Sequence, residues 1–292
     1  MNKQIILRGV ACAGLMLTNA AFAGATNIDT MFDKAKDVFT KMSVDAKLAV
    51  ANGNASAAQF NKGEVKGDGN TTNDSFNKAK KMLMKINAQH PYTVYCGAKF
   101  DQKKNIDLPE GMVPSVYGHR KKVEFEHILP AFNLGQAFPE WRNGHPNCID
   151  NKGKAFKGRN CAEKMNVEYR LMAADMYNLQ PSWGAVNAAR SNYNFAMLPA
   201  AKSSFGRCDF RIENRKAQPP ERARGLIART YFYMDAVYPK FQMSQQQRQL
   251  MTAWDKQYPV QANECRVAKE ISKIQGNMNE IVRQRCLAAK LW

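Results

Sequence analysis

An acidic residue stands directly beside a histidine in the segment 120–130, which reads Arg-Lys-Lys-Val-Glu-Phe-Glu-His-Ile-Leu-Pro and contains Glu126 and His127. At the end of a strand, such a pair can serve one site, where the carboxylate holds a metal ion and the imidazole takes a proton. The unperturbed imidazole pKa of ~6.5 suits proton transfer near neutral pH. A single Glu-His pair is weak evidence, because a histidine in such a place is more often structural. The rest of the chain must therefore decide between the two interpretations.

Further blocks of polar and aromatic residues follow in the chain. They are Asp-Met-Tyr-Asn-Leu-Gln-Pro-Ser at 175–182, Val-Asn-Ala-Ala-Arg-Ser-Asn-Tyr-Asn-Phe at 186–195, Pro-Pro-Glu-Arg-Ala-Arg-Gly-Leu-Ile-Ala-Arg-Thr-Tyr-Phe-Tyr-Met at 219–234, and Gln-Gly-Asn at 275–277. Together with the Glu-His segment, they closely resemble the signature blocks of the bacterial endonuclease I family. The blocks come in the family's order over roughly residues 75–290. Several matching blocks are a far stronger signal than any one motif.

The resemblance implies a ββα-metal finger, in which a two-stranded ribbon and a helix cradle one divalent ion. In that family the histidine of the Glu-His pair is the general base, which assigns this role to His127. The preceding glutamate and the asparagine of Val-Asn bind magnesium, which assigns these roles to Glu126 and Asn187. An arginine just before a cysteine helps to hold the phosphate, and Arg159 in Gly-Arg-Asn-Cys is the best match.

What the resemblance implies for the activity is Mg²⁺-dependent hydrolysis of DNA and RNA without sequence specificity, leaving 5′-phosphate and 3′-hydroxyl ends, with Mn²⁺ or Ca²⁺ able to substitute. The residue types suit this chemistry. Magnesium takes oxygen ligands, often only one or two from protein, so a carboxylate and an amide leave positions for water and phosphate. An arginine grips phosphate oxygens with a permanent charge. We expect Arg190, which closely follows Asn187, to contact phosphate as well.

Three positions depart from the family pattern. The family commonly has histidine at the position of Tyr177 and often a glutamate near the position of Ala173, which bears on metal affinity and rate. It usually has a second cysteine at the position of Ala98, so the disulfide set should differ. The polar loop at residues 143–157 also looks longer than is usual. The departures at Tyr177 and Ala173 motivate an alternative function, a non-catalytic nucleic-acid-binding protein on a decayed nuclease scaffold.

The elements that must position these residues are mostly helices, and we predict an α+β class with short strands around the ββα-metal core. We predict an N-terminal extension at 24–74, with an amphipathic helix at 27–51 and a polar linker after it, and a catalytic domain at 75–292. Expected helices cover 75–89, 162–178, 221–238 and most of the last ~50 residues, where Ser244 is a plausible N-cap. Expected strands are Tyr92–Cys96 and Val123–Leu129.

The N-terminus predicts export. Residues 1–23 combine a short basic region, a short apolar core and the sequence Ala-Phe-Ala, which is typical of a signal peptide cleaved after Ala23. Export to the periplasm or outside the cell permits disulfides, and six cysteines remain, namely Cys96, Cys148, Cys161, Cys208, Cys265 and Cys286. An even number in an exported chain predicts three disulfides, among fifteen pairings that the sequence does not distinguish. No Cys-x-x-Cys spacing supports a zinc site instead.

The charge favours a polyanionic partner. Without Lys3 and Arg8, 41 of the 43 basic residues remain against 25 acidic ones, a net charge of +16. Nucleic acid, acidic polysaccharide and anionic membrane all fit such a charge. No helix-turn-helix signal or recognition repeat indicates base reading, so we expect non-specific backbone binding by a monomer without an integral membrane segment. A third hypothesis is a cationic envelope protein that binds through residues 24–74.

Overall fold

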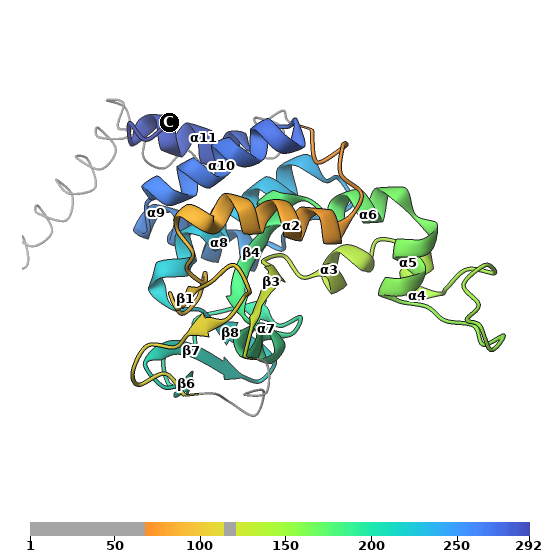
Figure 1. Cartoon of the computed structure of the whole chain (residues 1–292), viewed down its shortest axis with the longest axis horizontal. Coiled ribbons are helices and arrows are strands. Elements are labelled where there is room, and N and C mark those ends of the chain that lie inside the picture. The colour runs from red at the N-terminus through yellow and green to blue at the C-terminus, as the bar shows by residue number, and fades with distance from the viewer. Residues whose placement is uncertain (1–67, 114–120) are drawn as a thin grey trace, which may run out of the picture. The chain divides into compact units, whose positions relative to one another are not determined.

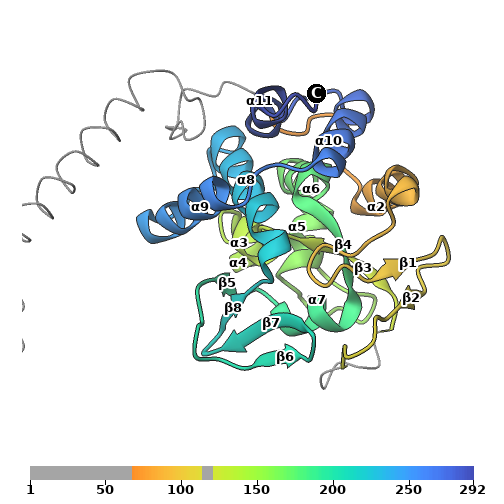
Figure 2. The ribbon, with the colours of Figure 1, turned by 90° about the vertical axis from the view of Figure 1, so that its left-hand side faces the viewer.

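The computed structural model describes residues 68–113 and 121–292. The chain divides into two compact units, residues 1–54 and 55–292, and the described residues belong to the second. The predicted signal peptide, the predicted helix over 27–51 and most of the predicted linker lie outside the described residues. Within the second unit, helices surround short strands (Figures 1 and 2), so the predicted α+β class is confirmed.

Helices make up most of the regular structure. They are α2 Phe76–Ile86, α3 Ala131–Gly135, α4 Pro139–Arg142, α5 Arg159–Met165, α6 Val167–Ala173, α7 Gly184–Arg190, α8 Glu221–Val237, α9 Gln245–Gln257, α10 Ala262–Gln275 and α11 Glu280–Ala288, with 3-10 turns at Asn87–Gln89 and Met176–Asn178. Ser75 caps α2 by accepting a hydrogen bond from the Lys78 amide. Ser244 caps α9 in the same way, from the Gln247 amide, as predicted.

The strands form three small sheets. The strands are β1 Lys99–Phe100, β2 Ile106–Asp107, β3 Val123–His127, β4 Leu179–Trp183, β5 Asn194–Phe195, β6 Ser203–Phe205, β7 Cys208–Glu213 and β8 Lys216–Gln218. β1 pairs with β2, β3 pairs with β4, and the third sheet has the order β5-β8-β7-β6. All pairs are antiparallel except β5 with β8. The predicted strand Val123–Leu129 is thus confirmed as β3, two residues shorter.

The core forms around α8, which lies between the other C-terminal helices and the strands (Figure 2). Most of α8 is buried, including Arg229, whose guanidinium forms ion pairs with Asp255 (2.9 Å) and Glu264 (2.7 Å). The residues just before α2 also belong to this body. Asn70 is buried, its backbone amide donates to the Tyr238 hydroxyl at 2.8 Å, and its side chain donates to a backbone carbonyl of α6.

Two predicted elements are wrong. Residues 92–96 are not a strand, because the chain folds back in a tight turn in which Thr93 and Ala98 pair and Gly97 takes a φ of +65°. The predicted helix over 162–178 is interrupted at Asn166, whose extended backbone (φ −123°, ψ 110°) ends α5. The Asn166 side chain then accepts a hydrogen bond from the Tyr169 amide and caps α6. Capping by asparagine outweighs the continuous apolar pattern there.

The six cysteines of the described residues form three disulfides, as predicted. Cys96 pairs with Cys208, Cys148 with Cys161, and Cys265 with Cys286. The first closes a long loop, with a sequence separation of 112, and joins the turn before β1 to β7. The other two are local, with separations of 13 and 21. Within the described ranges, none of the helices combines the length and apolar character that a membrane span requires.

Candidate active site

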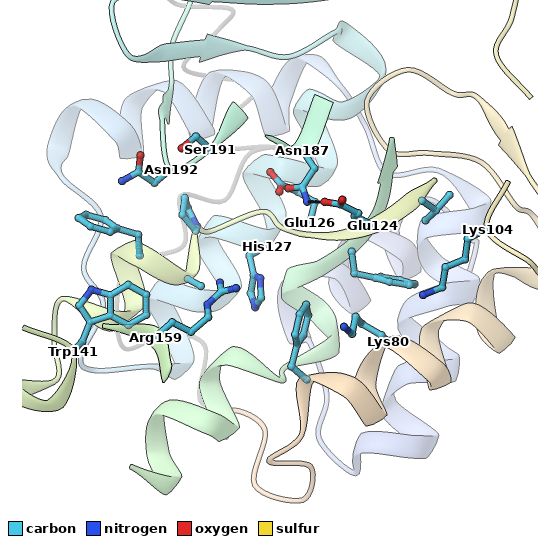
Figure 3. Close-up of a pocket in the computed structure, with 16 residues that line it drawn as sticks. Lys80, Lys104, Glu124, Glu126, His127, Trp141, Arg159, Asn187, Ser191 and Asn192 are labelled. Carbon is cyan, nitrogen blue, oxygen red and sulfur yellow. Dashed lines mark hydrogen bonds between the residues drawn. The ribbon is translucent and has the colours of Figure 1, made fainter. Parts of the chain in front are cut away.

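A two-stranded ribbon and a short helix carry the residues of the Glu-His and Val-Asn blocks. β3 and β4 pair in antiparallel register, with His127 opposite Leu179, and α7 follows β4 directly. A cleft of about 580 Å³ opens over this unit, and Figure 3 shows its lining side chains. The lining residues include Lys80, Lys104, Glu124, Glu126, His127, Arg159 and Asn187. The ribbon-and-helix arrangement expected from the resemblance is therefore present.

His127 is held in one orientation by a backbone acceptor. Its Nε2 lies 2.8 Å from the carbonyl oxygen of Ala173, at the end of α6. Because a carbonyl can only accept, Nε2 carries the hydrogen and Nδ1 keeps its lone pair. The Phe76 ring of α2 packs against the imidazole, with 4.8 Å between centroids. Burial, and then the positive charge of Arg159, lower the pKa of His127 to about 3, so the ring is neutral at pH 7.

Glu126 lies at the back of the cleft and is buried. Its Oε1 accepts hydrogen bonds from the Tyr95 hydroxyl (2.9 Å) and from Nη1 of Arg190 (2.7 Å). No described residue donates a hydrogen bond to Oε2. Burial raises the pKa of Glu126 to about 6, although Arg190 and Tyr95 act in the opposite direction. A positive charge placed at Oε2 would favour the ionised carboxylate further.

Asn187 faces the same region from α7, beside Glu124 (Figure 3). Its Nδ2 donates to Oε2 of Glu124 at 2.8 Å, and a carboxylate only accepts, so the amide oxygen is the end that stays free to coordinate. No cluster of three His, Cys, Asp or Glu side chains of metal-site geometry occurs among the described residues. The oxygens here come from two glutamates and one amide, and this hard donor set fits a magnesium-like cation.

Three cations line the other parts of the cleft. Arg159 begins α5 and forms a long ion pair with Glu163, at 4.0 Å, and its side chain is 45% exposed. Lys80 of α2 and Lys104 come from elements far from the Glu-His block in sequence. Burial, followed by the nearby charges of Lys104 and Arg159, lowers the pKa of Lys80. The cleft thus places several positive charges around an oxygen-rich centre, as an anionic substrate requires.

Buried hydrogen bonds fix the end of β3. Asn178 accepts from the Leu129 amide at 2.7 Å and donates to the Leu129 carbonyl at 3.0 Å. From the other side, Arg190 donates to the carbonyls of His127 (2.7 Å) and Ile128 (2.6 Å). These bonds connect the backbone that carries the imidazole to the 3-10 turn before β4 and to α7. The histidine is therefore attached to a rigid frame.

The structure brings His127, Glu126, Asn187 and Arg159 together, but the expected phosphate contact of Arg190 is wrong. Arg190 is 0% exposed, and its guanidinium stacks on Phe195 at 4.5 Å while it bonds Glu126 and the β3 carbonyls. An arginine at the last turn of a short helix can point into the core as easily as into the cleft, and here the buried carboxylate binds it.

Of the two departures that bear on rate, one lies outside the cleft and the other contacts His127 through its backbone. Tyr177 is buried, and its hydroxyl donates to the carbonyl of Asn277 at 3.0 Å, so it does not line the cleft. Ala173 contributes its backbone carbonyl to His127, a role that does not depend on the side chain.

Three cleft residues were missed by the sequence reasoning. Glu124 is two residues before Glu126, and the two-residue period of a strand places both side chains on one face, so this signal was available. Lys80 and Lys104 had no such signal, because only the packing of α2 and the β1–β2 region beside β3 brings them to the site.

Known proteins are similar in sequence to this chain over most of its length. The model of the family described as Endonuclease I matches residues 40–286. An "Endonuclease-1" of Buchnera aphidicola subsp. Acyrthosiphon pisum is 34% identical over 224 residues, which cover 74% of this chain and 83% of that protein. An "Extracellular deoxyribonuclease" of Aeromonas hydrophila is 35% identical over 73% of this chain and 89% of its own length. A "Periplasmic deoxyribonuclease" of the same organism is 34% identical, over 73% and 86%. With the ribbon, the helix and the cleft residues in place, this chain belongs to the Endonuclease I family.

Proposed function

We propose that this protein is a periplasmic or secreted, sequence-non-specific endonuclease that hydrolyses phosphodiester bonds of DNA and RNA with a divalent cation and His127 as the general base. The observation that carries the proposal is the hydrogen bond from Nε2 of His127 to the Ala173 carbonyl, at 2.8 Å. It leaves Nδ1 as an unprotonated acceptor within a cleft that is also lined by hard oxygen ligands and by cations.

The proton path follows from this tautomer. Nδ1 of His127 accepts a proton from the attacking water, and the resulting imidazolium keeps its Nε2–H bond to the carbonyl. Because the lowered pKa keeps the ring neutral, the base form is available throughout the neutral range. A low pKa also makes His127 a weak base, so its positioning contributes more than its basicity. General-base help of this kind is typically worth ~10²–10⁴-fold in rate.

The second part of the site would bind the metal ion and the phosphate. Glu126 and Asn187 would hold Mg²⁺ through Oε2 and the amide oxygen, beside Glu124. When bound, the ion supplies electrostatic stabilisation to the phosphate and to the departing 3′ oxygen, which leaves 5′-phosphate ends. Arg159 grips the non-bridging phosphate oxygens, since its guanidinium is exposed at the cleft. Mn²⁺ or Ca²⁺ accept similar oxygen ligands and could substitute.

Substrate and location are supported by charge and by the named relatives. The net charge of +18 over the full sequence favours a polyanion, and backbone contacts carry no sequence information. Two relatives are named extracellular and periplasmic deoxyribonucleases. The signal-like residues 1–23 and three disulfides fit the same compartments. We propose a monomer as the working form.

The decayed-scaffold alternative loses one of its two supports. The side chain at position 177 lies outside the cleft, and at position 173 the backbone carbonyl still holds His127. The groups that the chemistry needs, namely the imidazole of His127, the carboxylate of Glu126 and the amide of Asn187, all line it.

Plasmid nicking by the oxidised mature protein tests the proposal, with Mg²⁺ or EDTA, for wild type, His127→Ala and the control His90→Ala. His90 lies outside the cleft. We expect metal-dependent nicking that falls at least about 100-fold in His127→Ala and stays unchanged in the control. DNA binding by the wild type without any cleavage would instead favour the non-catalytic alternative.

A further inference from the structure

A basic hairpin projects beside the cleft and has no part in the chemistry above. It comprises residues 147–157, between α4 and α5, and stands out from the rest of the second unit in Figure 1. Ile149 and Ala155 pair in an antiparallel bridge, and the Phe156 amide donates to the Cys148 carbonyl at 2.8 Å. Gly153 makes the turn with a φ of +76°, a conformation that favours glycine.

The hairpin has a defined shape. The Asp150 carboxylate accepts hydrogen bonds from the backbone amides of Lys152 (2.8 Å) and Lys154 (2.9 Å), so the only acidic residue of the hairpin is engaged by its own turn. At the base, the Cys148–Cys161 disulfide joins the hairpin to α5. These bonds hold the hairpin in place without an ordered partner, which lowers the entropy cost of binding.

The charges of the hairpin point to a polyanion. Lys152, Lys154 and Lys157 are exposed, and none of the three forms an ion pair within the described residues. Three lysines against one aspartate give the hairpin a net charge of +2. Unpaired, exposed ammonium groups on a fixed arm are the groups that contact phosphates without reading bases.

The position of the hairpin next to the cleft favours nucleic acid over other polyanions. Its base is continuous with the cleft wall, because the Gly158 amide donates to the carbonyl of Trp141 at 3.0 Å, and Trp141 and Arg159 both line the cleft. The turn begins at Asn151, three residues beyond Cys148, so the tip lies about 10 Å from the base of the hairpin, at ~3.3 Å per residue. Along one DNA strand this corresponds to about three nucleotides, at ~3.4 Å each.

We propose that the basic hairpin is a second contact for the nucleic-acid backbone, which holds phosphates about three nucleotides from the bond that is cleaved. It would raise affinity for long substrates and contribute nothing to those that fill the cleft alone. The proposal rests on the proposed function for its substrate. Anionic membrane is disfavoured, because the hairpin stands at the rim of the phosphate cleft.

The test compares two charge-matched triple variants of the full oxidised protein. The hairpin variant is Lys152→Gln/Lys154→Gln/Lys157→Gln. The control is Lys216→Gln/Lys256→Gln/Lys290→Gln, at three exposed lysines that line neither the cleft nor the hairpin. The substrates are a 24-base-pair duplex and a thymidine trinucleotide. Duplex binding is also measured in EDTA, as a function of salt.

We expect KM for the duplex to rise on the order of tenfold in the hairpin variant, with kcat and the trinucleotide kcat/KM unchanged. The slope of log Kd against log salt should fall by about 2 to 3, or ~0.9 per lysine. Equal changes in the control variant, or none in the hairpin variant, would overturn the proposal. So would reduced binding to phosphatidylserine vesicles with unchanged duplex binding, which would assign the hairpin to membranes. If the wild type cleaves neither substrate, the proposed function fails, and the EDTA binding data still decide about the hairpin.

Discussion

Replacing the buried arginine behind the cleft should destabilise the protein in a way that depends on the protonation of one carboxyl. Arg190 is 0% exposed and its guanidinium donates to Glu126 at 2.7 Å and to the carbonyls of His127 and Ile128. Arg190→Met keeps a long side chain to pack on Phe195 but removes the charge and all these donors. This substitution therefore separates the effect of losing polar contacts from the effect of losing side-chain volume.

The magnitude follows from what is left behind. Breaking a buried ion pair by removing one partner costs about 3–5 kcal/mol, because the other charge stays buried and unpaired. Two backbone carbonyls also lose a donor, each worth about 1 kcal/mol or more. We therefore expect Arg190→Met to lower the free energy of unfolding by about 5–7 kcal/mol at pH 8. In a Glu126→Gln background the cost should fall by about 2 kcal/mol, because no charge is then left unpaired.

The pH dependence has a definite sign. The pKa of Glu126 is already raised to about 6 in the folded protein, and Arg190 acts to lower it, so the variant raises it further. A carboxyl whose folded pKa lies above its unfolded value of ~4.5 favours the folded state at low pH and loses that advantage as pH rises. The penalty of Arg190→Met should consequently be smallest near pH 4.5 and grow through pH 6 and above.

Urea unfolding of the oxidised protein measures these values, for the wild type, both single variants and the double variant, at pH 5 and pH 8. The double-mutant cycle then gives the coupling between Arg190 and Glu126. A cost below about 1 kcal/mol, or the same cost with and without the Glu126 charge, would refute the assignment of Arg190 as the residue that positions the carboxylate. A changed m-value would indicate an altered denatured state instead.

Three further changes have distinct outcomes. Glu124→Ala removes the acceptor that orients Asn187, so Mn²⁺ affinity measured by calorimetry should fall about 10–100-fold; unchanged affinity would contradict this. Cys96→Ser/Cys208→Ser opens a loop with a sequence separation of 112, so urea unfolding should show a loss of about 4–5 kcal/mol, against about 3 for the bridge with a separation of 13. Tyr177→His removes a buried hydrogen bond of the tyrosine hydroxyl outside the cleft, so thermal unfolding should show a loss of about 1 kcal/mol in stability. The kcat/KM on DNA should stay within about twofold, and a large gain in activity would show that position 177 does influence the active site.

Local patterns in the sequence were sufficient to predict several residues of the candidate site and the starts of two helices. Glu126 and His127 are neighbours on one strand, β3, in which every residue except Glu124 is buried. Ser244 caps α9 as predicted, and Ser75 caps α2 at the place where a helix was expected to begin. Such features depend on a few consecutive residues, so a linear pattern is sufficient to find them. The turn at residues 92–96 shows the limit, because the chain folds back there, with Thr93 paired to Ala98, despite a run of aromatic and β-branched residues.

Other features depend on residues that are distant in the chain. Which cysteines pair is decided by folding, since Cys96 and Cys208 meet only when the turn before β1 packs on β7. Lys80 reaches the cleft because α2 packs beside β3. The backbone partner of His127 is the carbonyl of Ala173, a contact that is independent of side-chain identity and so leaves no trace in the sequence.

The sequence by itself determined the family resemblance, the α+β class, the number of disulfides and the candidate groups for metal binding and proton transfer at Glu126, His127 and Asn187. The tertiary structure decided which way each group faces. Arg190 and Arg159 are both arginines near the site, yet one is fully buried against Glu126 and the other lies exposed at the cleft. Burial and pairing depend on the sum of long-range contacts, and the side chain of an arginine is long enough to satisfy either environment.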